Sequence, residues 1–194
     1  EELATDEAAD AGLVVTARSQ IARIDRWLRS FLALGAAASV ESEREDLADL
    51  LRGVVLESVQ QGRPVELAVE DEPLPVLAVG AAIRAALANL VDNAAEVTAP
   101  GGLVEVGARR AGAAAEVVIH DRGPGVPAEV RERLFSPHVT TKVGGSGMGL
   151  FLARQLIVSM HGGDLEVVDR AGGGTTVTVR LPLAEDGGGV ARGA

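Results

Sequence analysis

Three stretches decide the fold of this chain: NLVDNA (residues 89–94), DRGPG (residues 121–125) and TTKVGGSGMGL (residues 140–150). The first holds two asparagines, the second begins with a carboxylate at the end of an apolar strand, and the third has a lysine ahead of a glycine run. Each stretch alone is a weak signal. In this order and spacing they predict one pocket that binds ATP and Mg²⁺.

Composition limits the classes of function. The 194 residues carry a net charge of −10, which argues against a nucleic-acid partner because phosphate backbones need clustered cations. No apolar run approaches the roughly 20 residues that cross a bilayer. We therefore expect this part of the protein to be cytoplasmic, even if the full-length protein is membrane-anchored. The chain begins without Met and has no signal peptide, so we expect a fragment of a longer protein.

Hydrophobic periodicity predicts an α+β fold, a two-layer sandwich of helices on mostly antiparallel strands. Helices are expected over residues 46–60, 78–97 and 147–160, with a short one near 128–134. Strands are expected over residues 63–70, 103–109, 115–121, 165–169 and 175–181. An amphipathic helix over 13–34 should lie outside this sandwich. The expected domains are a helical extension (1–45), the main domain (46–184) and a disordered, glycine-rich tail (185–194).

Two asparagines mark the expected helix 78–97. Asn89 and Asn93 are four residues apart and therefore share a face of that helix. An amide side chain is unfavourable to bury without partners, so the pair suggests a polar site beside the core, although both could also be solvated. An amide oxygen can bind Mg²⁺, which takes its remaining ligands from water and nucleotide phosphates.

Asp121 ends the apolar strand AEVVIHD and precedes Gly123 and Gly125. A carboxylate at a strand end can accept a hydrogen bond from the amino group of adenine, and small neighbours let the base lie against the backbone. A plain Asp-x-Gly turn is the alternative explanation of the same residues. His120 is expected to face the opposite side and to be structural.

The glycine run is suited to bind phosphate groups. Gly144, Gly145, Gly147 and Gly149 lead into a helix expected to begin near Met148, so backbone amides can approach phosphate oxygens. Lys142, the only lysine in the chain, lies just upstream. It is either a chance residue on a solvated loop or a phosphate contact, for which a compact charge is suited.

Two better-known glycine motifs are excluded. The chain contains no GxxxxGK[ST] sequence, which rules out a P-loop. The stretch from Gly145 onward imitates a dinucleotide fingerprint, with Asp169 about 20 residues after the glycines. Leu150 stands where the third glycine belongs, however, and no apolar strand precedes the run.

Together the segments resemble the ATP-binding fold shared by sensor histidine kinases, gyrase, Hsp90 and MutL. The chain looks most like the catalytic domain of a two-component sensor histidine kinase of the nitrogen-sensor-like subclass, over residues 46–182. NLVDNA matches the N box, DRGPG and GGSGMGL the first two glycine boxes, LFSPHVTTK the F box and short lid, and GGGTTVTVRLP the final glycine box and strand. MHGG at residues 160–163 is also typical of the family.

The resemblance implies roles for individual residues. Asn93 would be the Mg²⁺ ligand, Asp121 the adenine contact, Lys142 a phosphate contact and Thr175 a support of the adenine site. The implied nucleotide-binding set also includes Asn89, Gly123, Gly125, Val126, Thr140, Thr141, Gly145, Ser146, Gly147, Met148, Gly149 and Leu150. Thr140 and Thr141 would lie in the lid, which closes over ATP in such proteins. Catalytic roles fall on Asn89 and Lys142.

Asn89 favours one branch of this fold. Hydrolytic relatives usually carry a glutamate at this position, whereas an amide cannot act as a general base at neutral pH. The resemblance therefore implies transfer of the γ-phosphoryl group to a histidine, and onward to the receiver domain of a response regulator, by a protein that is a homodimer at full length. The phosphoacceptor helix is missing, because helix 13–34 resembles the second helix of the dimerisation hairpin.

Two positions depart from the family pattern. His138 replaces the usual phenylalanine of the lid, and a packing role is expected for it. Glu96 stands where many members carry a cation, although an acid is common in this subclass. The alternatives to a kinase are a nucleotide-sensing interaction module that signals by lid closure, and a hydrolytic ATPase of the gyrase type.

Overall fold

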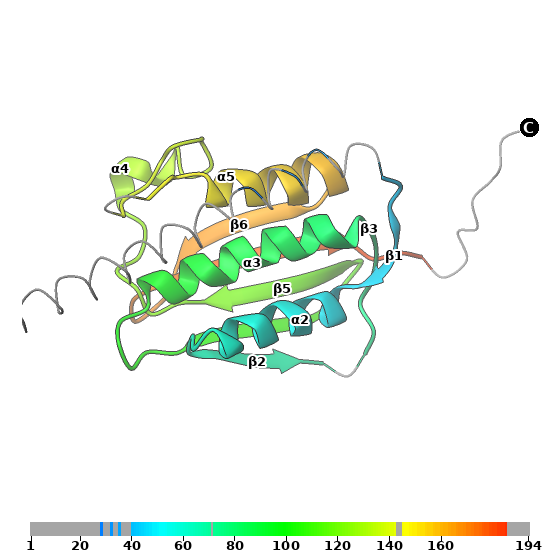
Figure 1. Cartoon of the computed structure of the whole chain (residues 1–194), viewed down its shortest axis with the longest axis horizontal. Coiled ribbons are helices and arrows are strands. Elements are labelled where there is room, and N and C mark those ends of the chain that lie inside the picture. Colours follow the sequence, from blue (N-terminus) through cyan, green and yellow to red (C-terminus); the bar gives the residue numbers. More distant parts are fainter. Residues whose placement is uncertain are drawn as a thin grey trace, which may run out of the picture.

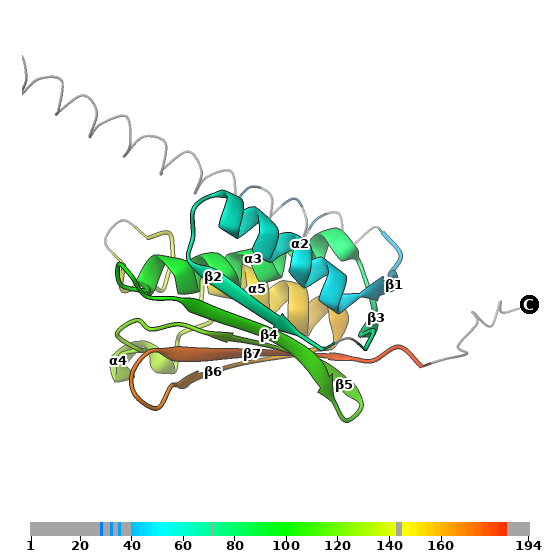
Figure 2. The same cartoon turned by 90° about the horizontal axis from the view of Figure 1, so that it is seen from below.

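A five-stranded sheet covered on one face by helices forms the body of the protein (Figures 1 and 2). The computed structural model describes residues 40–70, 72–142 and 145–185, with Leu28, Leu32 and Gly35. Helices α2 (Leu47–Gln60), α3 (Gly80–Val97) and α5 (Gly149–Arg154) lie side by side on the sheet. The predicted two-layer α+β sandwich is therefore confirmed.

The strand order in the sheet is β2-β4-β5-β7-β6. The strands are β2 (Val65–Val69), β4 (Val104–Ala111), β5 (Ala114–His120), β6 (Asp164–Asp169) and β7 (Thr175–Pro182). Only the β2–β4 pair of this sheet is parallel, and the other three pairs are antiparallel. The hairpin of β4 and β5 and the final strand agree with the sequence to within one or two residues.

Alternation along the strands separates a core face from an outer face. On β5, Ala115, Val117 and Ile119 are fully buried against the helices, while His120 lies on the outer face. The helices complete this core with apolar positions three and four residues apart, which include Leu47, Leu51, Ile83, Leu87 and Leu90. Because aromatic residues make up only 2% of the chain, aliphatic side chains fill the interior.

Side-chain hydrogen bonds mark the beginnings of α2 and α3. Helix α2 starts one residue later than expected because Asp46 caps it, with Oδ1 accepting a hydrogen bond from the amide of Ala48 at 2.9 Å. Helix α3 has no side-chain cap of its own at Val79. Instead, the amide of Val79 donates to Nε2 of His161 at 3.0 Å, which anchors the helix that carries both asparagines.

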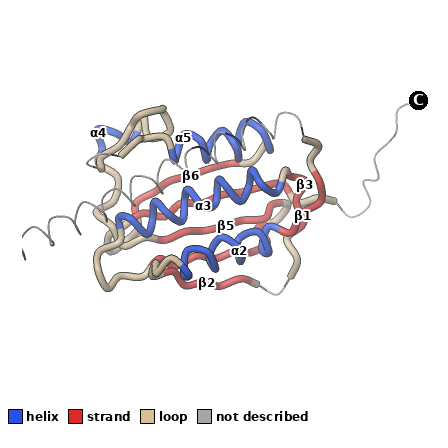
Figure 3. Tube along the Cα trace, in the orientation of Figure 1, coloured by secondary structure: helices blue, strands red, loops and turns tan. Residues whose placement is uncertain are grey.

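A second, two-stranded sheet was not predicted. Strands β1 (Glu43–Asp46) and β3 (Pro75–Ala78) pair antiparallel, and β3 touches the end of β7 through a bridge between Val76 and Leu183. The amide of Ala184 also donates to the carbonyl of Pro75 at 2.7 Å. These contacts bring the beginning and the end of the domain together, at the opposite end of the sheet from helix α4 (Ala128–Arg131) (Figure 3).

The helix after the glycine run differs from the prediction. It begins at Gly149 rather than Gly147, because Gly147 has a φ of 66°, which a right-handed helix does not allow. After Arg154 the chain widens into a π-helix (Gln155–Ser159). Helix α4 ends at Arg131, three residues before the expected end.

Parts of the predicted organisation fall outside the described residues. These are most of helix 13–34, of which only Leu28 and Leu32 are described, and the tail beyond Glu185. Within the part of the chain that the structure covers, none of the helices has the length and apolar character to cross a membrane.

Candidate functional site

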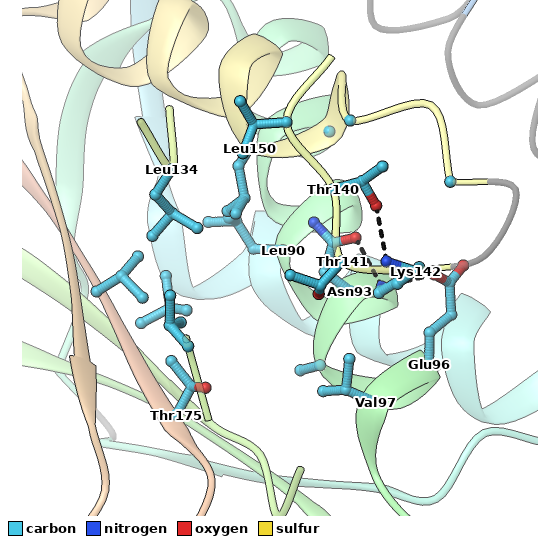
Figure 4. A pocket seen from close by; sticks show the side chains of 18 of the residues that line it. Leu90, Asn93, Glu96, Val97, Leu134, Thr140, Thr141, Lys142, Leu150 and Thr175 are labelled. Atoms are coloured by element: carbon cyan, nitrogen blue, oxygen red, sulfur yellow. Dashed lines mark hydrogen bonds and ion pairs between the residues drawn. The ribbon is translucent and has the colours of Figure 1, made fainter. Parts of the chain in front are cut away.

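One pocket receives all three stretches quoted at the outset (Figure 4). It lies between α3, the loop that follows β5, the segment around residues 139–150 and the edges of β6 and β7. The predicted residues that line it are Asn89, Asn93, Asp121, Gly125, Val126, Thr140, Thr141, Lys142, Gly145, Ser146, Gly147, Gly149, Leu150 and Thr175. Residues more than 80 positions apart in the sequence thus meet at a single cavity.

Gly123 and Met148 are not among the residues that line the pocket. A Cβ atom on Gly123 would come within 2.8 Å of a methyl group of Val97, so only glycine fits there without a shift. The Gly123 amide donates to Asp121 at 2.8 Å. Met148 precedes the first residue of α5. Gly123 thus packs against two residues of the pocket wall, Val97 and Asp121.

Asp121 is buried and its carboxylate is held in one orientation. Oδ1 accepts hydrogen bonds from the amide of Gly123 at 2.8 Å and from the amide of Thr175 at 3.0 Å. The amide of Asp121 in turn donates to the carbonyl of Thr175 at 2.9 Å. No described residue donates to Oδ2, so a ligand in the pocket can do so. The Asp-x-Gly turn therefore exists, and it also orients a carboxylate toward the cavity.

The two asparagines reach the pocket from α3, as their spacing predicted. Asn89 is buried, with 9% of its surface exposed, and Asn93 is half-buried. A Cβ atom on Gly149 would lie only 3.2 Å from Nδ2 of Asn93. The first residue of α5 therefore packs directly on the Asn93 amide, and a side chain there would displace it.

Lys142 lies across the polar side of the pocket. Its Nζ donates to Oε2 of Glu96 at 2.8 Å and to Oδ1 of Asn93 at 3.3 Å (Figure 4). Its backbone amide donates to Oγ1 of Thr140 at 3.1 Å. The Asn93 oxygen thus already accepts a hydrogen bond from a cation. A metal ion could bind this oxygen only after the Lys142 ammonium had moved aside, because like charges repel. Among the described residues there is no group of three His, Cys, Asp or Glu side chains that could hold a metal without phosphate oxygens.

The glycines of the third stretch pack closely on the segment that precedes them. A Cβ atom on Gly147 would lie 2.4 Å from the carbonyl carbon of His138, and one on Gly145 would lie 2.4 Å from Oγ1 of Thr140. Gly147 also has a positive φ, which disfavours any other residue. A side chain at Gly145 or Gly147 would therefore push this run away from the segment on which it packs.

Sequence reasoning missed the apolar wall of the pocket. Figure 4 shows Leu90, Leu134 and Leu150 on one side and Asn93, Lys142 and Glu96 on the other. The pocket residues that were not predicted are Leu90, Asp92, Ala94, Glu96, Val97, Pro124, Pro127, Val130, Leu134, Val139, Leu152, Val167 and Val177. The cavity consequently combines an apolar half suited to a flat ring with a polar half suited to charged oxygens.

The positions of His138 and His120 test what the sequence predicted for these two residues. The expected packing role of His138 is wrong, because this residue is exposed and its backbone has a φ of 64° beside Gly147. His120 lies on the outer face of the sheet, as expected, with Nδ1 2.8 Å from Oγ1 of Thr176. Partial burial and the nearby charge of Arg170 lower the pKa of His120 below its usual value.

Residues 78–185 match the family model described as "Histidine kinase-, DNA gyrase B-, and HSP90-like ATPase". The chain belongs to this family. The match covers α3, all the pocket-forming loops and the strands β4 to β7. Helix α2 precedes it but contributes Leu47 and Leu51 to the same core.

Similar proteins narrow the family to histidine kinases. The C4-dicarboxylate transport sensor protein DctS of Rhodobacter capsulatus is 44% identical over 109 residues, which are 54% of this chain and 16% of DctS. The solved structure of the mycobacterial sensor histidine kinase MprB is 32% identical, with a TM-score of 0.64 over 74% of this chain and 98% of that one. The solved catalytic domain of histidine kinase ThkA is 29% identical, with a TM-score of 0.67 over 74% and 97%.

These comparisons confirm the resemblance to a histidine kinase catalytic domain. The chain spans between 16% and 33% of the lengths of the first curated relatives it matches. The similarity therefore identifies a catalytic domain, and the activity of a whole kinase is a matter for proposal. The narrower subclass and the role of each pocket residue stay predictions.

Proposed function

We propose that this chain is the ATP-binding catalytic domain of a sensor histidine kinase, which holds ATP with Mg²⁺ for transfer of the γ-phosphoryl group to a histidine. The observation that carries this proposal is the convergence of Asp121, Asn93 and Lys142 on one half-apolar pocket. The solved complex of ShkA with AMPPNP, which is 26% identical with a TM-score of 0.68 over 89% of this chain and 39% of ShkA, supports an ATP-like ligand.

The apolar half of the pocket suits the adenine ring. Oδ2 of Asp121 would accept a hydrogen bond from the adenine amino group, while Oδ1 stays bound to the backbone amides of Gly123 and Thr175. Aliphatic side chains such as Leu90 and Leu134 would cover the ring. Gly125 and Val126 would border it without obstructing its approach.

The polar half suits the phosphates and the metal. Asn93 would contribute its amide oxygen to Mg²⁺, which neutralises phosphate charge when bound. Lys142, Thr140 and Thr141 would contact phosphate oxygens, together with backbone amides of the run from Gly145 to Leu150. Asn89 cannot remove a proton at neutral pH, so its role is to position groups, and catalysis rests on positioning and charge stabilisation.

The partners follow from the same relationship. The solved complex of ThkA with response regulator protein TrrA is 25% identical, with a TM-score of 0.67 over 86% of this chain and 49% of ThkA. It supports a receiver domain as the eventual phosphoryl acceptor. We further propose that residues 46–184 form the catalytic unit. Helix 13–34 would then serve the dimerisation hairpin of a full-length homodimer, beside a phosphoacceptor helix in the cytoplasm, where ATP is available.

Transfer in trans tests this function. The chain is mixed with Mg²⁺, γ-labelled ATP and a separately produced dimerisation hairpin that carries an acceptor histidine. We expect acid-labile label on the hairpin, and none when its histidine is replaced by alanine. Binding of ATP without transfer would support an interaction module instead. Steady phosphate release that is lost in Asn89→Ala would support a hydrolytic ATPase.

A further inference from the structure

Glu105 joins two loops on the outer face of the sheet. Its Oε1 accepts a hydrogen bond from Nη2 of Arg122 at 2.8 Å, and its Oε2 accepts one from Nη2 of Arg170 at 2.7 Å. The hydrogen bonds from Arg122 and Arg170 hold the pKa of Glu105 below its ordinary value, so the carboxylate is charged at neutral pH. Glu105 itself does not line the pocket.

The two arginines belong to the two segments that orient Asp121. Arg122 follows Asp121 directly. Arg170 begins the turn between β6 and β7, where its amide donates to the carbonyl of Gly174 at 3.0 Å. A Cβ atom on Gly174 would lie 2.1 Å from the carbonyl oxygen of Asp121, so the two backbones are in direct contact. The next residue, Thr175, donates to Oδ1 of Asp121.

We propose that Glu105 is a positioning residue that sets the purine preference of the pocket by holding these two segments against each other. The inference rests on the proposed function, in which Asp121 reads the amino group of adenine. That hydrogen bond is directional and weakens steeply when its angle changes. Because Glu105 acts through Arg122 and Arg170, it affects the reading of the base without touching the nucleotide.

The same face of the sheet provides a matched control. Glu116 also binds two arginines, with Oε1 2.7 Å from Nη2 of Arg109 and Oε2 2.8 Å from Nε of Arg180. Glu116 lies four residues before His120 on β5, whereas Glu105 is the register partner of His120 on β4. Four residues of a strand span about 13 Å. Glu116 therefore has the same chemistry as Glu105 but lies away from the loops of the pocket.

The experiment compares Glu105→Gln with Glu116→Gln. Each glutamine keeps the size of the side chain but loses the charge, and it can accept a hydrogen bond from only one of the two arginines. Binding of ATP and of inosine triphosphate, which carries an oxo group in place of the adenine amino group, is measured by calorimetry. The ratio of the ATP affinity to the inosine triphosphate affinity is the preference for ATP. In Glu105→Gln we expect this ratio to fall by about two- to thirtyfold. Glu116→Gln should lower thermal stability and leave the preference unchanged.

The outcomes separate the inference from the proposed function. If the unaltered chain prefers ATP and Glu105→Gln keeps that preference within about twofold, Glu105 is only structural and the inference is wrong. Equal weakening of ATP binding and inosine triphosphate binding would also show that Glu105 is only structural. If the unaltered chain does not distinguish the nucleotides, the assignment of Asp121 fails together with the inference. Arg170→Gln, which removes one arm alone, tests the same idea should Glu105→Gln not fold.

Discussion

Lys142 and Glu96 form an ion pair, with Nζ 2.8 Å from Oε2, across 46 residues of sequence. The same ammonium group lies 3.3 Å from Oδ1 of Asn93. The lysine expected to contact phosphate is thus docked on α3, beside the expected metal ligand. If Lys142 contacts phosphate as proposed, nucleotide binding replaces its Glu96 carboxylate partner with a phosphate. Glu96, which stands where many members of the family carry a cation, thus pairs with the cation of Lys142.

Glu96→Gln should strengthen ATP binding, because the variant frees Lys142 and removes a negative charge from beside the phosphates. Both side chains are about a third exposed, and such ion pairs contribute only about 0.2–1 kcal/mol. We therefore expect affinity to increase by up to about fivefold. Titration calorimetry measures it. Glu57→Gln is the control, because Glu57 pairs with Arg84 away from the pocket and its loss changes the net charge equally.

Lys142→Ala should weaken ATP binding by about tenfold or more, since a hydrogen bond to a charged group is lost. Adenosine, which lacks phosphates, should bind this variant nearly as well as the unaltered chain. Competition against a fluorescent nucleotide gives both affinities. Equal losses for ATP and adenosine would show that Lys142 does not contact phosphate.

Asp121→Asn should weaken nucleotide binding by about 1–3 kcal/mol. The asparagine oxygen can still accept the hydrogen bonds from Gly123 and Thr175, so the fold should persist. Its amino group would then face the amino group of adenine, and two donors cannot pair. Calorimetry together with a circular dichroism spectrum separates binding from folding. An unchanged affinity would remove Asp121 from the base-binding site.

Glu116→Gln should make the protein less stable at neutral pH by about 1–3 kcal/mol. Burial alone would raise the pKa of Glu116, but hydrogen bonds from Arg109 and Arg180 outweigh it and hold the pKa below its ordinary value of 4.5. The folded state therefore binds this proton less readily than the unfolded chain. The stabilisation is complete above about pH 4.5 and is lost as the pH falls through the folded pKa.

Urea unfolding at several pH values measures this difference. The free energies of unfolding of Glu116→Gln and the unaltered chain should converge as the solution becomes more acidic than pH 4.5. Curves that stay parallel over that range would show that the carboxylate charge does not contribute. Asp49→Asn serves as a control, because Asp49 forms an exposed pair with Arg52 on a single helix.

Local chemistry made the polar part of the site predictable. Asn89 and Asn93 stand four apart on a largely apolar helix, so their shared face follows from helix geometry. Asp121 follows from its place at a strand end ahead of glycines. The apolar wall did not follow, because Leu90 and Val177 obey the same periodicity as core residues. Only the three-dimensional arrangement distinguishes a side chain that borders a cavity from one that is enclosed.

The missed elements have a similar cause. Strand β1 reads Glu-Arg-Glu-Asp, which lacks the alternation that marks a strand, and it exists because β3 pairs with it. The π-helix over Gln155–Ser159 has no sequence signal of its own. The pairing of Lys142 with Glu96 depends on how the segment after residue 138 returns to α3, which spacing along the chain does not specify.

The joining of β1 to β3 and of β3 to the end of β7 brings residues 43 and 183 to the same end of the domain. Helix α3 runs from that end to the pocket, and its 18 residues span about 27 Å. A rotation of about ten degrees about the β1 end of the domain would displace the pocket end of α3 by roughly 5 Å. If the proposed phosphoryl transfer takes place, a small change of backbone angle near Glu43 would therefore alter the distance between the pocket and an acceptor histidine.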